Sequence, residues 1–472
     1  VIDTARERRL QADVGAAAPC LVEALCARSS LLQRKGRAGR VRAGLCITLL
    51  TRGEYDALPP EAPPEIESAA LESLCLQVRV CGFDPGQFLA EMPTPPHAVR
   101  RERAERMLMK IGAVREATNG AEVVTALGQH LAALPCDVHL GKLLVVGAFL
   151  GVASMALDVA AMLSVRSPLK SVVRDPGAEA WRQRLRQSLR PGGTKSDHCL
   201  YARLLQLWTG CPGKAEQREL CKDAALVWER MVEASTVRSQ LASGLQGLGF
   251  DVRSGGGEDD RCAGEWRALR VAVTAAFYPH VARVKRPPPD FVKTLAGALE
   301  KDPEARQLRY FVQTDPAAEA AAAVGDSMGG GRRRDVRAFL HPASLLFKET
   351  GFSCPYIVFS SKQLQQARGG GGGSGDHASS TKLSLSDASE ASIYALLLFG
   401  GALAVDHREN RITVDDWICF SGGSTTVVAL MERLRCEIDA LLLQKIAEPS
   451  LKLGQVPACQ VVSTLLSTDG LG

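Results

Sequence analysis

Metal-ligand spacings are missing from this 472-residue sequence. None of its 14 cysteines stands in a Cys-x-x-Cys pair, and its eight histidines form no His-Glu-x-x-His motif. A structural zinc site therefore has no support, and we expect no metal-ligating residues. Scattered cysteines in a chain of this size are more typical of buried thiols in a reducing compartment than of a disulfide framework. We therefore expect an intracellular protein, cytoplasmic or nuclear.

Long apolar runs are missing as well. The longest charge-free apolar stretches, residues 143–157 and 391–405, hold 15 residues each, fewer than the ~20 that a membrane-spanning helix needs. At the start of the chain an acidic residue, Asp3, precedes any apolar region, which argues against a signal peptide. We expect no membrane partner. Because the first residue is not Met, we expect this sequence to be part of a longer protein.

The composition describes a folded protein with a mild positive charge. At ~150 residues per domain, the length suggests about three domains. Apolar residues make up 46% of the chain, so buried cores are expected. The 57 basic and 52 acidic residues leave a net charge of only +5. Any site for nucleic acid must therefore come from local clustering of cations.

One such cluster is the octamer at residues 33–40, QRKGRAGR, which combines four cations with two glycines. Arginine suits a polyanion because its planar fork donates two parallel hydrogen bonds to phosphate and keeps its charge near neutral pH. We expect the glycines to let the backbone approach such a ligand and to adopt a positive φ where needed. A solvated cationic turn or a localisation patch is the alternative.

The octamer resembles motif VI (Gln-Arg-x-Gly-Arg-x-Gly-Arg) of the superfamily 2 helicases, in the form used by the DEAH/RHA group of RNA helicases. In that group the motif lies on the second RecA-like domain and faces ATP held by the first. The resemblance implies that Gln33 lies near the γ-phosphate and that Arg37 and Arg40 contact the phosphates. Arg40 would be the arginine finger, which is worth ~10³ to 10⁵ in rate. The implied catalytic residues are Arg40, Arg37 and Gln33, and Gly36 joins them as ATP-binding.

The rest of the chain resembles the same group in the same order, through segments such as Pro64-Glu65-Ile66, Ser196-Asp197-His198 and His341-Pro342-Ala343-Ser344. The implied fold class is multidomain α+β, with a RecA-like remnant, a winged helix, a helical ratchet bundle and an OB-fold β-barrel. The implied domains are 1–58 (RecA-like α/β remnant), 59–130 (winged helix), 131–253 (helical ratchet, or helicase-associated domain 2), 254–265 (linker), 266–446 (OB fold, with insertions at 317–334 and 366–380) and 447–472 (tail).

Three local expectations accompany this order. Residues 6–26 occupy the place of the family's β-hairpin, which wedges at the nucleic-acid fork. Residues 269–274 alternate like a strand and lead into the decamer 275–284, which resembles the opening of the OB fold. Residues 427–446 form an amphipathic helix. Its expected apolar face consists of Val427, Leu430, Leu434, Ile438, Leu441 and Leu442.

The resemblance also implies an RNA channel, along which single-stranded RNA advances 3′ to 5′. The wall of such a channel needs cations directed at the RNA backbone and occasional surfaces on which bases can stack. The candidate RNA-binding residues are Tyr278, His280, Arg283, Lys285, His341 and Ser344. For Tyr278 and His341, packing within the fold is the alternative. The expected partner is RNA, as a single strand or a duplex with a 3′ overhang, bound by a monomer; a glycine-patch or other regulatory protein is a further expected partner.

The sequence lacks the motifs that cradle the phosphates of ATP in a helicase. No Gly-x-x-x-x-Gly-Lys-Ser/Thr loop and no Asp-Glu-Ala-His segment occurs, so nothing here would cradle phosphates or hold the metal. The resemblance implies ATP with Mg²⁺, bound mainly by a first RecA-like domain that these residues do not include. We predict that the chain alone does not hydrolyse ATP. A non-catalytic RNA-binding or adaptor module is the alternative function.

Overall fold

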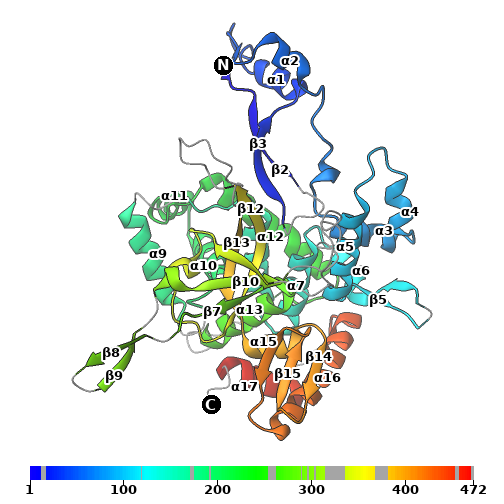
Figure 1. The fold of residues 1–472 in the computed structure, drawn as a ribbon, viewed down its shortest axis with the longest axis vertical. Helices are drawn as coiled ribbons and strands as arrows, with labels where there is room; N and C mark the ends of the chain where they lie inside the picture. Colours follow the sequence, from blue (N-terminus) through cyan, green and yellow to red (C-terminus); the bar gives the residue numbers. More distant parts are fainter. Residues whose placement is uncertain are drawn as a thin grey trace.

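The computed structural model describes most of the chain as five packed units (Figure 1). The described residues are 1–11, 18–118, 120–170, 175–190, 193–252, 262–288, 290–294, 297–301, 304–313, 335–366, 381–451 and 456–468. The expected insertion at 317–334 lies outside them, as does most of the expected insertion at 366–380. Residues 254–261 of the expected linker also lie outside.

The N-terminal unit is a small α/β layer at the top of Figure 1. Strands β1 (Ile2–Asp3) and β4 (Ile47–Thr48) pair in parallel, with helices α1 (Arg28–Lys35) and α2 (Arg52–Ala57) beside them. Parallel strands require a crossover connection, which the intervening chain with α1 provides. Its small core consists of Ala5, Cys26, Leu31 and Leu58.

A β-hairpin descends from this unit into the body of the molecule (Figure 1). Its strands β2 (Arg6–Gln11) and β3 (Cys20–Leu25) are antiparallel over six residue pairs. At its far end Cys20 pairs with Leu364 of another unit. The expected hairpin is therefore confirmed as a structural element.

The second unit combines helices with a short hairpin. It contains η1 (Glu65–Glu67), α3 (Glu72–Val80), α4 (Pro85–Ala90), α5 (Ala98–Ile111), β5 (Val114–Glu116), β6 (Glu122–Val124) and α6 (Ala126–Ala133). Leu76, Leu89 and Leu108 are among its fully buried residues, and β5 and β6 pair antiparallel. The expected winged helix at 59–130 stays a prediction for this unit.

The third unit is a helical bundle. It contains α7 (Val138–Phe149), α8 (Ala153–Ser164), α9 (Pro176–Ser188), α10 (Asp197–Gly210), α11 (Lys214–Asp223), α12 (Trp228–Gly247) and α13 (Cys262–Phe277). Helices α7 and α8 are buried on nearly every side, which explains why their sequences are apolar all round.

The expectation of a strand at residues 269–274 was wrong, because these residues lie within α13. All six side chains, from Leu269 to Thr274, are buried between other helices and the neighbouring barrel. A segment buried on every side carries no amphipathic signal, so its alternation did not reveal its secondary structure. The surrounding alanines favour a helix.

The fourth unit is a closed five-stranded barrel. Its strands are β7 (Val281–Lys285), β10 (Arg309–Gln313), β11 (Asp335–Leu340), β12 (Tyr356–Gln366) and β13 (Thr381–Glu390), with η2 (Ala305–Gln307), η3 (Leu345–Lys348) and the hairpin β8 (Asp290–Thr294) and β9 (Gly297–Lys301) attached. The closed order is β7-β10-β11-β13-β12-β7; β11 and β13 are parallel and the other neighbours antiparallel. This order is compatible with an OB-like fold.

The fifth unit follows the barrel and packs against α13 and α7. It contains α15 (Ile393–Phe399), the antiparallel sheet β14 (Leu403–Asp406), β15 (Arg411–Val414) and β16 (Ile418–Ser421), then α16 (Thr425–Ala447) and α17 (Pro457–Thr468). The expected helix at 427–446 is confirmed as α16. Its expected face is wrong at one end, because Val427 and Leu430 are exposed while Val428 and Ile438 are buried.

Among the described residues, no single helix is long and apolar enough to cross a membrane; α6 and α7, bent by 114°, pass that test only as a pair. The same residues contain no cluster of side chains suited to a metal ion.

Candidate nucleotide-facing and RNA-facing sites

The basic octamer begins inside α1 and continues into the loop that follows it. Leu31 is the buried residue of α1 and fixes the helix against the small core, while Gln33 on the opposite side is exposed. Gly36 ends the helix with a φ of −61°. The expectation of positive φ was therefore wrong for Gly36, which continues the right-handed turn.

The three arginines of the octamer lie in different environments. Arg34 is directed inward, where its guanidinium donates to Asp3 at 3.2 Å, to Glu7 at 3.4 Å and to the carbonyl of Arg6. Arg37 and Arg40 are exposed, as is Gln33. Within the described part of the chain, none of these three exposed side chains has a hydrogen-bond or ion-pair partner. Gln33, Arg37 and Arg40, the residues expected to face ATP, are thus the ones that the fold leaves exposed to solvent.

A close backbone contact shapes the loop that carries Arg37 and Arg40. A Cβ atom at Gly44 would lie 2.0 Å from the carbonyl oxygen of Ala38, whereas a Cβ at Gly39 would have no atom within 4 Å. Gly44 is therefore the glycine that this loop needs for close approach. It lies outside the octamer, and no motif in the sequence pointed to it.

Tyr278, a candidate RNA contact, lies in the core. It is 2% exposed, and its hydroxyl donates to the carboxylate of Asp415. Burial, together with the Asp415 carboxylate, raises the pKa of this phenol, so it remains a hydrogen-bond donor. This environment favours the packing alternative for Tyr278.

His280 is partly exposed and packs against aromatic rings. Its imidazole stacks on Phe359 at 5.4 Å between ring centroids and lies 4.7 Å from the ring of His139. Burial, with the neighbouring His139, lowers the pKa of His280 well below its usual value. The ring is therefore neutral at physiological pH and supplies no charge for phosphate.

Arg283 and Lys285 lie on the outward side of β7, because Ala282 and Val284 face the barrel core. Arg283 forms an ion pair with Asp335 of β11. The ammonium group of Lys285 lies 4.8 Å from the ring centroid of Phe311 on β10. These two cations are placed where a polyanion could reach them.

His341 and Ser344 follow β11. The Nδ1 atom of His341 accepts from the Ala343 amide, and the hydroxyl of Ser344 accepts from the Leu346 amide at the start of η3. The six candidate RNA contacts thus occupy three environments rather than one cluster: the core, the outer side of β7 and the end of β11.

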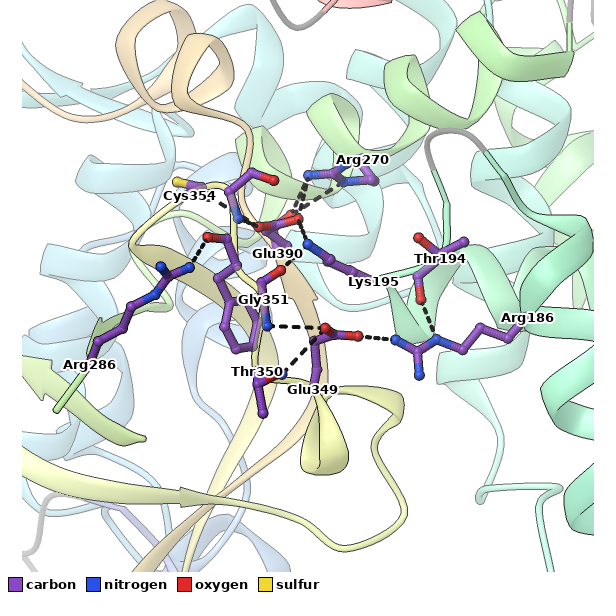
Figure 2. Close-up of polar contacts among 12 residues, drawn as sticks. Arg186, Thr194, Lys195, Arg270, Arg286, Glu349, Thr350, Gly351, Cys354 and Glu390 are labelled. Carbon is purple, nitrogen blue, oxygen red and sulfur yellow. Dashed lines mark hydrogen bonds and ion pairs between the residues drawn. The ribbon is translucent and has the colours of Figure 1, made fainter. Parts of the chain in front are cut away.

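Sequence reasoning missed a buried polar network that joins the helical bundle to the barrel (Figure 2). Glu390, at the end of β13, is 3% exposed. One carboxylate oxygen accepts from the amides of Ser353 and Cys354, and the other lies 3.6 Å from Arg270 and 3.8 Å from Lys195. Figure 2 shows these groups converging from both sides of the junction.

A second carboxylate fastens the same loop. Glu349 pairs with Arg186 of α9 and accepts from the Thr350 and Gly351 amides at 3.3 and 3.2 Å. Arg186 in turn donates to the carbonyl of Thr194 at 2.9 Å (Figure 2). Residues 349–354 are therefore held to the bundle by paired charges, which makes the junction rigid. No spacing in the sequence could have shown these long-range partners.

Asp197 is the third carboxylate at this junction. It accepts from the amides of Leu345 at 2.7 Å and Ala388 at 2.8 Å, so α10 is bonded to two barrel segments. Burial raises the pKa of Asp197 to about 7, although hydrogen bonds from Ser344 and the two amides act in the opposite direction. Burial also lowers the pKa of the adjacent His198 to about 3.

Comparisons with known proteins agree with this architecture. Residues 137–201, in the helical bundle, match the model of the ratchet-like helicase associated domain (HA2). Residues 410–468, in the fifth unit, match the model of a C-terminal domain in RNA helicases.

Curated relatives match along essentially the whole chain. A putative DEAH-box ATP-dependent helicase of Mycosarcoma maydis is 30% identical over 500 residues, covering 100% of the chain and 30% of the relative. The DExH-box ATP-dependent RNA helicase DExH1 of Arabidopsis thaliana is 28% identical, covering 96% of the chain and 40% of the relative. The putative ATP-dependent RNA helicase DHX57 of Homo sapiens is 28% identical, covering 99% and 33%. The chain thus spans 30% to 40% of the length of these relatives.

The bundle and the terminal unit thus match two domains that are found in RNA helicases. Along its whole length the chain is similar to the C-terminal portion of DEAH-type RNA helicases.

Proposed function

We propose that the chain is the C-terminal part of an ATP-dependent RNA helicase that moves 3′ to 5′ and supplies motif VI to ATP hydrolysis. The observation that carries this proposal is the sorting of the octamer's side chains. Arg34 is used internally by Asp3 and Glu7, while Gln33, Arg37 and Arg40 are left exposed. A set of exposed donors on a small α/β unit suits the phosphates of a nucleotide held by a neighbouring domain.

The surface around β1 and β4 supports the same proposal. Several apolar side chains there are exposed, including Ile2 at 74% and Leu45 at 72%. Apolar surface of this kind is normally covered by another domain or partner. We propose that further strands and helices of the second RecA-like domain cover this surface, and that a first RecA-like domain, facing the octamer, binds most of the ATP and Mg²⁺. In this arrangement Arg40 stabilises charge on the transferring phosphoryl group and Gln33 orients the attacking water.

We further propose that the remaining units form the wall of the RNA channel. The second unit acts as a winged helix, the bundle as the ratchet and the barrel as the OB fold. The hairpin of β2 and β3 is the proposed wedge at the nucleic-acid fork. Arg283 and Lys285 are the best supported RNA contacts because they are cations on the outer side of β7. His341 and Ser344 would contribute from the end of β11. The proposed protein is intracellular and monomeric, with a glycine-patch or other regulatory protein as its partner.

Measurements on the full-length gene product and on the 472-residue chain test this function. The full-length product of the gene that encodes the chain should hydrolyse ATP faster with RNA, and should unwind a duplex with a 3′ overhang but not one with a 5′ overhang. The 472-residue chain alone should bind RNA weakly, with an affinity that falls steeply with salt, and should show no ATP turnover. RNA binding by a full-length product without ATPase activity would instead support an adaptor module.

A further inference from the structure

The outer surface of the barrel carries a mixed basic and aromatic strip. The outward residues of β7, β10, β11 and the start of β13 alternate with residues that fill the barrel core. We call this strip the outer barrel face: Arg283, Lys285, Arg309, Phe311, Gln313, Asp335, Arg337, Phe339 and Lys382. It includes five cations and one carboxylate, and that carboxylate is already paired with Arg283.

Two phenylalanines lie among these charges. Strand register places Phe311 directly opposite both Arg283 and Arg337. Phe339 is two residues beyond Arg337 on β11, so it is the diagonal neighbour of Phe311, at roughly 7–8 Å between the two positions. Both rings are half-buried rather than enclosed. A solvated strand face has no need of two aromatic rings at outward positions.

Each ring has a cation beside it. The Lys285 ammonium lies 4.8 Å from the centroid of Phe311, and the Arg337 guanidinium lies 4.9 Å from the centroid of Phe339. Lys382 lies on β13, which pairs with β11, and its ammonium group lies 5.6 Å from the centroid of the Phe339 ring. These contacts hold the charges beside the rings without neutralising them. In the described part of the chain, Lys285, Arg309, Arg337 and Lys382 have no carboxylate within ion-pair distance.

We propose that the outer barrel face binds single-stranded RNA, with bases stacked on Phe311 and Phe339 and the flanking cations on the phosphates. Aromatic rings suit unpaired bases because every base has a flat apolar face, and cations spaced along the strands suit the backbone. The inference rests on the proposed RNA-binding role and deepens it by specifying a stacked, sequence-tolerant contact. A duplex would not satisfy this face, since its bases are already stacked on one another.

Binding would exchange one set of contacts for another. The bases would stack on the exposed parts of the rings, and Lys285, Arg337 and Lys382 would move from the rings to phosphate oxygens. The affinity should therefore depend on both the rings and the charges. Loss of a ring should weaken binding at every salt concentration, whereas loss of a cation should mainly reduce the salt dependence.

The test measures binding of a fluorescent oligouridylate and of a blunt RNA duplex to the full 472-residue chain by anisotropy, at several salt concentrations. The Phe311→Ala/Phe339→Ala variant should bind oligouridylate at least ~25-fold more weakly, about fivefold per ring. Arg337→Gln/Lys382→Gln should reduce the slope of log affinity against log salt by about 1.4, since two phosphate contacts are lost. Phe83→Ala is the matched control, because Phe83 is 57% exposed but lies on the second unit.

Three results would overturn the proposal. The first is oligouridylate binding by the double phenylalanine variant within about twofold of the wild-type chain; RNA binding elsewhere would then stand, and this face would be left to a protein partner or to solvent. The second is a preference for the blunt duplex that the phenylalanine variant retains. The third, no RNA binding by the folded wild-type chain, would contradict the proposed channel wall as well. Circular dichroism of each variant verifies folding.

Discussion

Arg34 donates to the carboxylate of Asp3 across 31 residues of sequence, at 3.2 Å. The same Asp3 oxygen accepts from the Ala5 amide at 2.8 Å, and the carbonyl of Asp3 accepts from the Leu49 amide at 2.8 Å. One guanidinium thus ties α1 to the strand pair of the N-terminal unit. Arg34 therefore positions the octamer within the fold, whereas Arg37 and Arg40 remain available to a ligand.

Replacing Arg34 by Ala should loosen the N-terminal unit. Asp3 is only 7% exposed and would lose its charged partner, but Arg34 is 35% exposed, so solvent screening limits the cost to about 1 kcal/mol. Hydrogen exchange at the Leu49 amide should accelerate roughly fivefold. Arg37→Ala is the control, because its side chain is exposed. Equal exchange in the two variants would show that Arg34 does not anchor the strands.

Gly44→Ala should open the loop that carries the outward arginines. The new methyl group would collide with the Ala38 carbonyl, and such overpacking costs about 1–3 kcal/mol. The Ala38 amide, which donates to Lys35, should then exchange faster. Gly39→Ala is a matched change in the same loop, where the methyl group has open space. Unchanged exchange in Gly44→Ala would rule out the close approach.

Asp197→Asn should weaken the junction between bundle and barrel, because an amide cannot accept from both the Leu345 and Ala388 N–H groups. One buried donor would be left unpaired, at a cost of about 1–3 kcal/mol. Chemical unfolding of the full chain measures this difference.

The difference in stability between the wild-type chain and Asp197→Asn should depend on pH. The pKa of Asp197 is about 7 in the folded chain and near its ordinary 3.8 when unfolded. Between pH 4 and 7 the folded state holds a proton that the unfolded state has lost, so rising pH favours unfolding. The wild-type advantage over Asp197→Asn should shrink across this range. Asp223→Asn, at an exposed position, should show no such trend. A gap that stays constant from pH 5 to pH 7 would mean that Asp197 is already ionised in the fold.

Tyr278→Phe should reduce stability without altering RNA binding. The change removes the hydroxyl that donates to Asp415, at a cost of about 1–2 kcal/mol, while the ring still fills the core. Tyr394→Phe provides a comparison at a half-buried tyrosine. A clear loss of RNA affinity in Tyr278→Phe, with stability unchanged, would instead show that Tyr278 contacts RNA.

Sequence reasoning anticipated a helical ratchet bundle, because short segments that resemble the helicase group indicated it. The octamer pointed to Gln33, Arg37 and Arg40, and the periodicity of residues 427–446 predicted a helix. Chemistry that depends on distant partners was not visible. Nothing near Arg34 shows that Asp3 and Glu7 will bind it, and nothing near Glu390 points to Arg270 or Lys195.

Fully buried segments set a second limit. Residues 269–274 have large apolar side chains at every second position, Leu269, Val271 and Val273, yet tertiary packing surrounds the segment on every side and a helix satisfies its backbone. On α16 Val427 and Leu430 are exposed although Val428, which lies between them, is buried, so at the start of the helix the buried side is rotated away from the expected apolar face. Pattern alone does not show where a packing partner ends.

The central claim is that the outward arginines act on a nucleotide, and RNA-stimulated ATP turnover of the full-length gene product tests it most directly. Arg40→Ala should lower kcat by about 10³-fold or more, while Arg42→Ala, an equally exposed arginine two residues further on, should stay within about twofold of wild type. Full turnover in Arg40→Ala, or an equal loss in both variants, would contradict the account.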